Sequence, residues 1–174
     1  MATEPEAVSA VIQPDPAVAL HDFVFEHHSR LIRLALLITR SVDEAEDAVQ
    51  AAFERAWRHR ASLADPSRLR PWLDRIVVRE AIRASRQPTR APHVELRPDF
   101  DRDTSRPDTA HQTIAVHQAL DQLAPDHRAV VVLHLYAGYT VAETAAALNL
   151  RLETARSRLR VARDRLRHLL AEEG

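Results

Sequence analysis

Glycine is almost absent from this chain, and its scarcity limits the possible folds more than any other feature of the sequence. The 174 residues contain two glycines, Gly138 and Gly174. Rossmann and P-loop nucleotide sites need several glycines close together, and tight β-hairpin turns use glycine as well. Aliphatic residues instead recur at spacings of three and four residues, which is typical of α-helices. We therefore expect an all-α fold without a phosphate-binding loop.

Cysteine is absent altogether, so disulfides, thiolate metal ligands and cysteine nucleophiles are excluded. The sequence has no run of 18 apolar residues, and its N-terminus lacks a basic segment followed by an apolar one. A membrane span or a secretory signal would require those patterns. We therefore expect a cytoplasmic protein with no membrane insertion.

The net charge of -1 conceals an uneven distribution of charge along the chain. All 24 basic residues are arginines, and residues 1–20 contain three acidic residues and no arginine. Residues 21–90 contain 13 arginines against 10 acidic residues, and residues 151–170 contain seven arginines against two acidic residues. Local basic surfaces are therefore compatible with the near-neutral total.

Proline-rich stretches divide the chain into segments. Prolines and acidic residues near the N-terminus indicate a mobile tail, and four prolines between positions 88 and 107 indicate a flexible linker. We expect two small helical domains joined by that linker, the C-terminal one a helix-turn-helix. The expected segments are a disordered acidic tail at 1–20, a helical bundle at 21–87, the linker at 88–113 and the second domain at 114–174.

The helix-turn-helix prediction rests on a capping signal followed by two helical patterns. Thr140-Val-Ala-Glu143 is a capping box, in which two side chains satisfy free amides at a helix start. The short helix that it starts ends near Leu148, and a turn at Asn149-Leu150 leads into a longer helix. This sequence of elements predicts a helix-turn-helix.

The helix before this motif is expected to begin at Pro125, because proline is tolerated at the first helical position. Gly138 is expected to end it, since glycine readily adopts the left-handed conformation found after helices. Its apolar stripe, expected to be buried, consists of Ala129, Val132, Leu133 and Tyr136.

A predicted helix from Pro71 to Arg86 has an arginine at every third or fourth position. At 100° per residue these side chains fall within about 80° of one another, and Trp72 projects beside them. Guanidinium groups bind phosphates, and an indole can stack on an unpaired base, so this face favours nucleic-acid binding over a merely solvated surface. Glu80 points to the apolar side, where we expect it to pair with an arginine or to lie at the edge of the core. The first arginine strip consists of Arg75, Arg79, Arg83 and Arg86.

The last predicted helix repeats this pattern. In a helix-turn-helix the start of the second helix meets base edges, while flanking cations meet phosphates. A basic C-terminal half that complements the helix dipole would explain the late arginines but not the early ones. The second arginine strip consists of Arg156, Arg160, Arg163 and Arg167, and the first turns also expose Glu153, Thr154, Ser157 and Arg158.

The order and spacing of these segments resemble the extracytoplasmic-function (ECF) sigma factors of bacterial RNA polymerase. Asp43-Glu-Ala-Glu-Asp-Ala-Val-Gln-Ala-Ala-Phe-Glu-Arg-Ala-Trp57 is similar to the core-binding helix of sigma region 2. Arg70-Pro-Trp-Leu-Asp-Arg-Ile-Val-Val-Arg-Glu-Ala81 is similar to the segment that meets the −10 promoter element. The similarity to region 4, which reads the −35 element, lies in Leu123–Leu133, Thr140–Leu148 and Thr154–Leu159. The resemblance covers residues 21–87 and 114–171.

The resemblance implies three sets of binding residues. Those for core polymerase are Glu46, Asp47, Gln50 and Phe53. Those for the −10 element are Trp72, Arg75, Arg79, Arg83 and Arg86. Those for the −35 element are Arg151, Glu153, Thr154, Arg156, Ser157, Arg158, Arg160 and Arg163.

The chain also departs from the family pattern at positions that face DNA. Arg79 and Arg83 stand where many members have Asn and Asp. Asn149, Arg151 and Glu153 replace the frequent Gly, Pro and Gly of the region 4 turn. The base preferences usual in the family are therefore not carried over to this chain.

The resemblance further implies partners and excludes chemistry by the chain itself. The implied partners are the RNA polymerase core, through a coiled coil of its largest subunit and its flap, promoter DNA, and an anti-sigma factor. No cofactor, metal or catalytic residue is implied, because the polymerase performs the chemistry.

Two other functions stay open from the sequence. An autonomous helix-turn-helix regulator would bind duplex DNA tightly without polymerase. A helical metalloenzyme would use some of the ten histidines, but no His-x-x-x-His or His-Glu-x-x-His pairing occurs. The residue spacing also gives no support to a Ser-His-Asp set.

Overall fold

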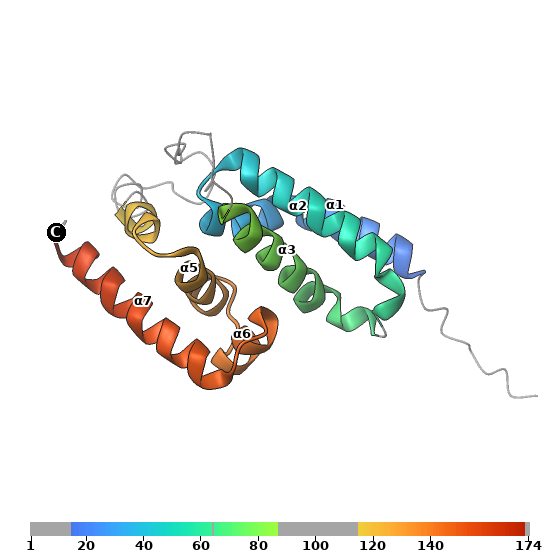
Figure 1. Cartoon of the computed structure of the whole chain (residues 1–174). Helices are drawn as coiled ribbons and strands as arrows, with labels where there is room; N and C mark the ends of the chain where they lie inside the picture. Colours follow the sequence, from blue (N-terminus) through green and yellow to red (C-terminus); the bar gives the residue numbers. More distant parts are fainter. Residues whose placement is uncertain (1–14, 64, 87–114, 173–174) are drawn as a thin grey trace, which may run out of the picture.

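The protein forms two helical units that lie side by side (Figure 1). The structure, a computed structural model, describes residues 15–63, 65–86 and 115–172, and within these ranges it contains helices and no strand. The first unit contains α1 (Pro16–Thr39), α2 (Val42–Arg58), two 3-10 turns (Arg60–Ser62, Pro66–Arg68) and α3 (Leu69–Ser85). The second contains a helix over residues 115–121, α5 (Pro125–Val131), a π-helical turn (Val132–Tyr136), α6 (Val141–Leu148) and α7 (Leu152–Glu172). The predicted all-α fold is confirmed, and the predicted linker at 88–113 lies outside the described residues.

Small side chains allow the helices of the first unit to pack closely. The buried face of α2 carries alanines at helical spacing together with Val49. Large side chains of α1 and α3 fill the space against it, among them Leu34, Ile38 and Leu73, each at most 1% exposed. The first unit is therefore a three-helix bundle with an aliphatic core, as the periodicity predicts.

The N-terminal helix begins earlier than the proline pattern predicts. A disordered tail was expected through residue 20, but α1 starts at Pro16, and Leu20 is fully buried. The Asp15 side chain accepts a hydrogen bond from the backbone N–H of Ala17 at 2.9 Å. Proline suits the first helical turn, so Asp15-Pro16 is a helix start rather than a sign of disorder. Residues 1–14 of the predicted tail lie outside the described residues.

A π-helical turn changes which face of the α5 region is buried. The N–H of Ala137 donates to the carbonyl of Val132 at 2.9 Å, a bond across five residues. The wider turn displaces later side chains around the axis, so Tyr136 is 49% exposed rather than part of the predicted buried stripe. Gly138 follows with a φ of 79°, the left-handed conformation expected at a helix end.

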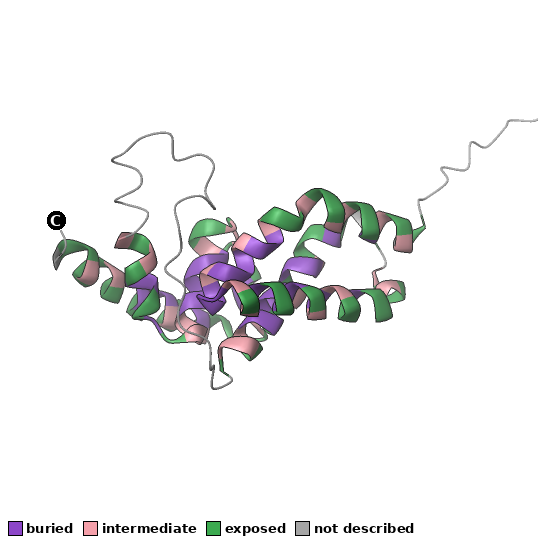
Figure 2. Ribbon diagram, turned by 90° about the horizontal axis from the view of Figure 1, so that it is seen from above, coloured by how far each residue is buried: buried purple, intermediate pink, exposed green. Residues whose placement is uncertain are grey.

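The two units share a core. Ala129, Val132, Leu133 and Ala147 of the second unit belong to the same buried cluster as the core of the first. Figure 2 shows buried residues concentrated where the two units meet. A smaller cluster within the second unit consists of Leu120, Leu123, Val130, Val131, Leu159 and Ala162.

Two buried arginines join the units near the end of α1. Arg128 is 6% exposed and donates to the carbonyls of Leu120, Ile38 and Leu123 at 2.9, 2.5 and 2.8 Å. Burial lowers its pKa to about 10, and the nearby Arg40 adds to the effect. Arg40 is itself 4% exposed, and its guanidinium forms an ion pair with the carboxylate of Asp121. The sequence alone did not identify either arginine as part of the core.

A buried carboxylate joins the units at a second place. Asp74 of α3 is fully buried and accepts from Nη1 of Arg30 at 3.1 Å. The hydroxyl of Tyr139, which precedes α6, donates to the same oxygen at 3.0 Å. Burial and the neighbouring Asp74 carboxylate raise the pKa of Tyr139. Asp74 therefore connects α1, α3 and the start of the helix-turn-helix.

Candidate nucleic-acid interface

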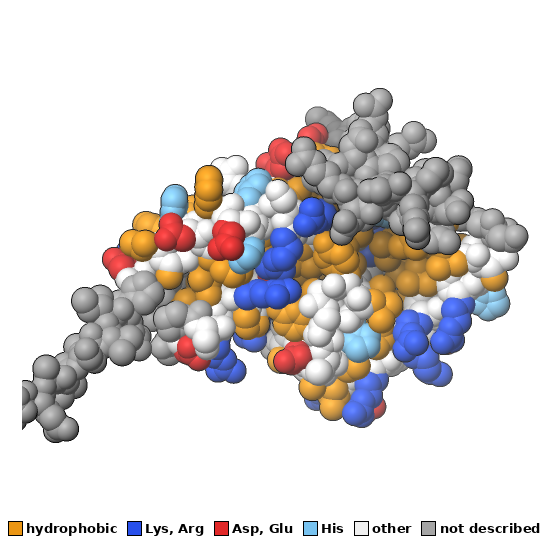
Figure 3. All heavy atoms as spheres, turned by 180° about the vertical axis from the view of Figure 1, so that it is seen from behind, with side chains coloured by type: hydrophobic (Ala, Val, Ile, Leu, Met, Phe, Trp, Pro, Cys, Tyr) orange, Lys and Arg blue, Asp and Glu red, His pale blue; other side chains and the backbone are white. Residues whose placement is uncertain are grey.

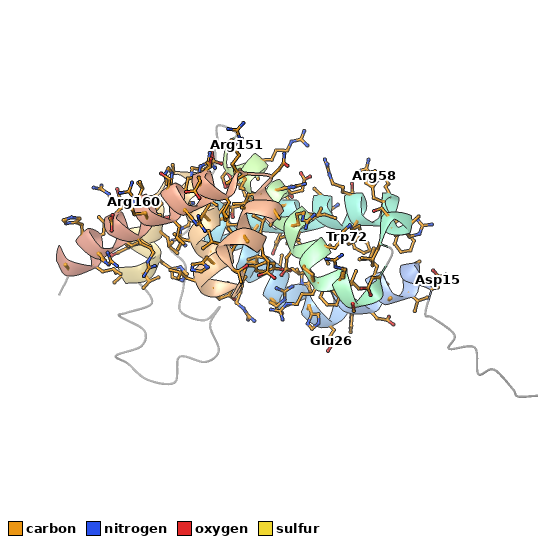
Figure 4. All side chains as sticks on the ribbon, turned by 90° about the horizontal axis from the view of Figure 1, so that it is seen from below. Asp15, Glu26, Arg58, Trp72, Arg151 and Arg160 are labelled. Carbon is orange, nitrogen blue, oxygen red and sulfur yellow. The ribbon has the colours of Figure 1, made fainter. Side chains whose placement is uncertain are left out.

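α3 presents the first arginine strip on its exposed side. All four arginines of the strip are exposed, whereas Leu73, Val77 and Val78 on the opposite side are at most 1% exposed. Trp72 is half-buried and packs against the margin of the first core. Figure 4 labels it on α3. The helix thus combines a basic face with an indole beside it.

Glu80, the carboxylate on the apolar side of this helix, is neutralised from two directions. It is 9% exposed, and its Oε1 lies 2.9 Å from Nε of Arg55 on α2. Nη1 of Arg83 lies 3.9 Å from its other carboxylate oxygen. The expected pairing with an arginine is confirmed. Although Arg79 is exposed overall, the partial burial of its guanidinium lowers its pKa, and repulsion from Arg75 and Arg55 acts in the same direction.

α7 presents the second arginine strip along its solvent-facing side, while Ala155, Leu159 and Ala162 hold the opposite side against the second unit. Arg156 donates from Nη1 to Oε1 of Glu153 at 2.5 Å. Figure 4 shows Arg160 on this helix and Arg151 immediately before it, both pointing outward. The exposed members of the predicted −35 set are Arg151, Glu153, Arg156, Ser157, Arg160 and Arg163, and Thr154 and Arg158 are half-buried.

The turn between α6 and α7 sets the position of this basic face. The Thr140 hydroxyl accepts from the N–H of Glu143 at 3.2 Å, and the Glu143 carboxylate accepts from the N–H of Thr140 at 2.8 Å, so the predicted capping box is present. That backbone hydrogen bond lowers the pKa of Glu143. Asn149 ends α6 with a φ of 56°. Asparagine tolerates this left-handed conformation, which explains why the turn forms without the glycine frequent in the family.

α2 presents an acidic face to solvent near its start. Glu46, Asp47 and Gln50 are exposed along this helix. Phe53 is half-buried against the core, and its ring centroid lies 6.1 Å from that of Trp57. The four residues predicted to bind core polymerase therefore lie on one helix, with acceptors toward its start and an aromatic pair toward its end.

An apolar depression extends this face beyond the predicted residues. It has a volume of about 420 Å³ and is lined by His21, Phe53, Glu54, Trp57 and Arg58. Trp57 is 41% exposed although it is one of the largest hydrophobic side chains. Trp57 is absent from the polymerase-binding set predicted from the sequence, although its spacing of four residues from Phe53 places both side chains on the same helix face. His21 comes from α1, and no local sequence pattern indicates that it lies here.

On the face of the molecule shown in Figure 3, the basic surface is discontinuous. In Figure 3, basic side chains form separate groups with hydrophobic side chains exposed between them. This arrangement agrees with local basic patches on a near-neutral chain.

The described residues give no support to a metal centre. Among the side chains that the structure describes, no group of three or more His, Asp or Glu is placed to hold a metal ion. No helix in the described ranges has both the length and the apolar character needed to cross a membrane.

Comparisons with known proteins identify the family. Residues 23–91 match sigma-70 region 2, and residues 119–168 match sigma-70 region 4. The chain is 40% identical over 148 residues to the ECF RNA polymerase sigma factor SigM of Mycobacterium tuberculosis, covering 83% of this chain and 73% of SigM. The chain belongs to the ECF sigma factor family. This ECF sigma factor is also 36% identical over 162 residues to SigL of Mycobacterium tuberculosis, covering 90% of this chain and 89% of SigL.

A solved structure supports the fold of this sigma factor independently. The sigma factor RpoE in complex with the anti-sigma factor NepR from Bartonella quintana superposes with a TM-score of 0.68. The match covers 87% of this chain and 96% of the RpoE chain at 24% sequence identity. The two-unit helical architecture is therefore that of known sigma factors.

Proposed function

We propose that this sigma factor divides promoter recognition among three surfaces. α2 docks on the polymerase core, the first arginine strip contacts the −10 element, and α7 contacts the −35 element. The observation that carries this assignment is the exposure of arginines along one side of both α3 and α7, in units that match regions 2 and 4. The chain supplies no catalytic residue, and it acts in the cytoplasm, where the polymerase performs the chemistry.

The polymerase-binding assignment includes Glu46, Asp47, Gln50 and Phe53. Exposed acceptors suit a basic partner surface, and the apolar depression beside Phe53 suits an aliphatic or aromatic side chain of that partner. We assign residues 21–87 to this role and to −10 binding, and residues 114–174 to −35 binding. The coiled coil of the largest polymerase subunit would contact the first unit, and the flap would contact the second.

The −10 assignment rests on chemistry that suits unpaired bases. Trp72 offers a stacking surface of a kind worth about 1–3 kcal/mol per base. The exposed guanidinium groups beside it bind phosphates and stack on bases. The assigned residues are Trp72, Arg75, Arg79, Arg83 and Arg86.

The −35 assignment rests on the geometry of a helix-turn-helix in the major groove. Residues near the start of α7 meet base edges, with about 1–3 kcal/mol of discrimination for a good bidentate contact. Later arginines on the same side meet phosphates. The assigned residues are Arg151, Glu153, Thr154, Arg156, Ser157, Arg158, Arg160 and Arg163.

We also propose that an anti-sigma factor regulates this chain. Support comes from the structurally similar RpoE, which was solved in complex with an anti-sigma factor. Such a partner would compete with polymerase or DNA for the surfaces assigned above.

In vitro transcription with purified core polymerase over a promoter library tests the function and the promoter sequence together. A sigma factor should produce specific transcripts only when core enzyme and this chain are both present. An autonomous regulator would instead protect duplex DNA from nuclease without polymerase, and that result would overturn the proposal.

Two variants test the assigned surfaces separately. Asp47→Ala should weaken binding to core polymerase in a titration, with unchanged folding because Asp47 is exposed. Arg156→Ala should reduce protection of the −35 element by the holoenzyme while core binding stays normal. Asp164→Asn is a matched control, because Asp164 is an exposed acidic residue of α7 outside both sets. Wild-type behaviour of either test variant removes that assignment.

A further inference from the structure

A groove between the two units gathers guanidinium groups from two helices. Its volume is about 520 Å³, within the range of about 300–1,000 Å³ that is usual for small-molecule sites. α3, α7, the start of α5 and the end of α6 all contribute to its lining. We call it the arginine groove, after Arg79, Arg83 and Arg86 of α3 and Arg158 of α7.

Positive charge in the arginine groove exceeds negative charge. Its four lining arginines face one lining carboxylate, that of Asp126, which leaves an excess of three positive charges. Nη2 of Arg86 lies 2.6 Å from Oδ1 of Asp126, and Nη2 of Arg158 lies 3.7 Å from Oδ2. A single carboxylate therefore faces two guanidinium groups and cannot neutralise both.

The other two arginines of the groove are compensated only in part. Arg79 donates from Nε to the backbone carbonyl of Ala147 at 2.9 Å, and that acceptor has no net charge. Nη1 of Arg83 lies 3.9 Å from Glu80, a carboxylate that Nε of Arg55 approaches to 2.9 Å. Partial burial lowers the pKa of Arg79, and repulsion from neighbouring arginines acts in the same direction. An added anion would stabilise the charged form of this guanidinium.

The arginine groove also has an apolar lining. Ile82 of α3, Leu148 at the end of α6 and Leu150 of the following turn line it, and each is half-buried. Aliphatic side chains can contact the face of a planar ring, whereas guanidinium groups bind phosphate oxygens in a fork. The groove thus combines a surface for a ring with groups for phosphates.

We propose that the arginine groove binds a small ligand of the nucleoside polyphosphate class. The phosphates of this ligand contact the four guanidinium groups, and its ring lies on the apolar lining. Two or three linked phosphates bring about three to four negative charges, which match the excess of positive charge in the groove. The proposal goes beyond promoter recognition and does not depend on it, because the ligand binds the free chain.

DNA phosphates have the same chemistry, but the shape of the groove favours a small ligand. Both units line the groove, so a bound group lies between them rather than on one open face. The side chain of Arg158 is 28% exposed, against 58% for Arg156 on the outer side of the same helix. A DNA duplex, whose major groove alone is about 12 Å wide, is too broad to enter a cavity of this volume.

The test measures binding of ATP, GTP and inorganic tripolyphosphate to the full chain without polymerase or DNA. Isothermal titration calorimetry gives the affinity and the number of ligands per chain, at about 0.15 M salt to screen weak binding to exposed charges. We expect one nucleotide per chain, with ATP or GTP bound at least about fivefold more tightly than tripolyphosphate, because the ring buries apolar surface. Tripolyphosphate has at least as much negative charge but no ring, so charge alone predicts the opposite order.

Matched arginine variants locate the site, and circular dichroism checks that each variant is folded. Arg83 pairs with Glu80 of its own helix, so Arg83→Gln removes a charge of the groove without breaking an ion pair between the units. This variant should weaken nucleotide binding about tenfold or more, because a phosphate loses a charged donor. Arg75→Gln, exposed on the same helix outside the groove, should change the affinity less than about threefold. Arg158→Gln and its control Arg160→Gln form a second pair on α7, with the same expectation.

Three results would overturn the inference. Absence of binding by both nucleotides up to about 1 mM would show that the groove does not hold them. Equal weakening by the groove variants and their controls would show a diffuse attraction of polyanions, DNA included, to exposed arginines. Binding of tripolyphosphate as tight as that of the nucleotides would show that no ring is recognised. None of these measurements includes promoter DNA or polymerase, so the transcription assay tests the proposed function independently.

Discussion

Replacing the buried Arg128 with methionine should lower the free energy of unfolding much more than the same replacement at an exposed arginine. Arg128 donates to four backbone carbonyls, three of them at 2.9 Å or less, and one of these three belongs to α1 of the other unit. Methionine keeps much of the apolar stem but cannot donate. The Arg128→Met variant would therefore lose all of these bonds, although the Ile38 carbonyl would keep the Ser85 hydroxyl as a donor and the Leu120 carbonyl would keep the N–H of Leu123.

The expected loss of stability is the difference between two opposing contributions, the hydrogen bonds of Arg128 and the cost of burying its charge. Hydrogen bonds to a charged group contribute about 1.5–3 kcal/mol each, so three bonds contribute about 4.5–9 kcal/mol. Burial opposes them, because the pKa of Arg128 falls from 12.5 to about 10. At 1.36 kcal/mol for each pKa unit, that shift corresponds to about 3 kcal/mol. We therefore expect Arg128→Met to lower the free energy of unfolding by about 1.5–6 kcal/mol, the difference between these two contributions.

Urea unfolding followed by circular dichroism measures this loss, with Arg165→Met as the matched control. Arg165 is exposed on α7, so the same chemical change there should alter stability by less than about 0.5 kcal/mol. Trp57 and Trp72 both lie in the first unit, and their fluorescence reports its unfolding separately. Equal unfolding midpoints for Arg128→Met and Arg165→Met would refute the reasoning.

Further predictions concern the core, the capping box and a tyrosine. Leu73→Ala, at a site 1% exposed, should lower the free energy of unfolding by about 2–5 kcal/mol in urea. Thr140→Ala should cost about 1 kcal/mol in the same assay, because Glu143 loses its cap, and an unchanged midpoint would contradict this. In a Tyr136→Phe chain, absorbance at 295 nm follows Tyr139 alone, and its phenolate should form only well above pH 10. Stability should fall as the pH rises past 10, because the unfolded chain loses this proton first.

Local signals predict most of the helices and their exposed faces. The capping box at Thr140 and the spacing of arginines on α3 and α7 each depend on residues within one or two turns. The same holds for the acidic face of α2. These features could be predicted because their physical causes lie between near neighbours in the sequence.

The contacts between the units could not be predicted in this way. Arg128 meets the carbonyl of Ile38, and Tyr139 meets Asp74, across 90 and 65 residues of sequence. Nothing local distinguishes Arg128, which is buried, from Arg165, which is exposed. The π-helical turn that exposes Tyr136 likewise interrupts a periodicity that by itself indicates a continuous α-helix.

Arginine has two properties that lysine lacks and that matter in this chain. On the exposed faces of α3 and α7, the planar guanidinium suits phosphates and bases. In the junction between the units, Arg128 directs Nε, Nη1 and Nη2 to four different carbonyls, whereas the three donors of a lysine share a single nitrogen. A count of basic residues therefore overstates the charge available to DNA, because Arg40 and Arg128 hold the fold together. In the proposed function, the exposed arginines rather than the net charge of -1 determine where DNA binds.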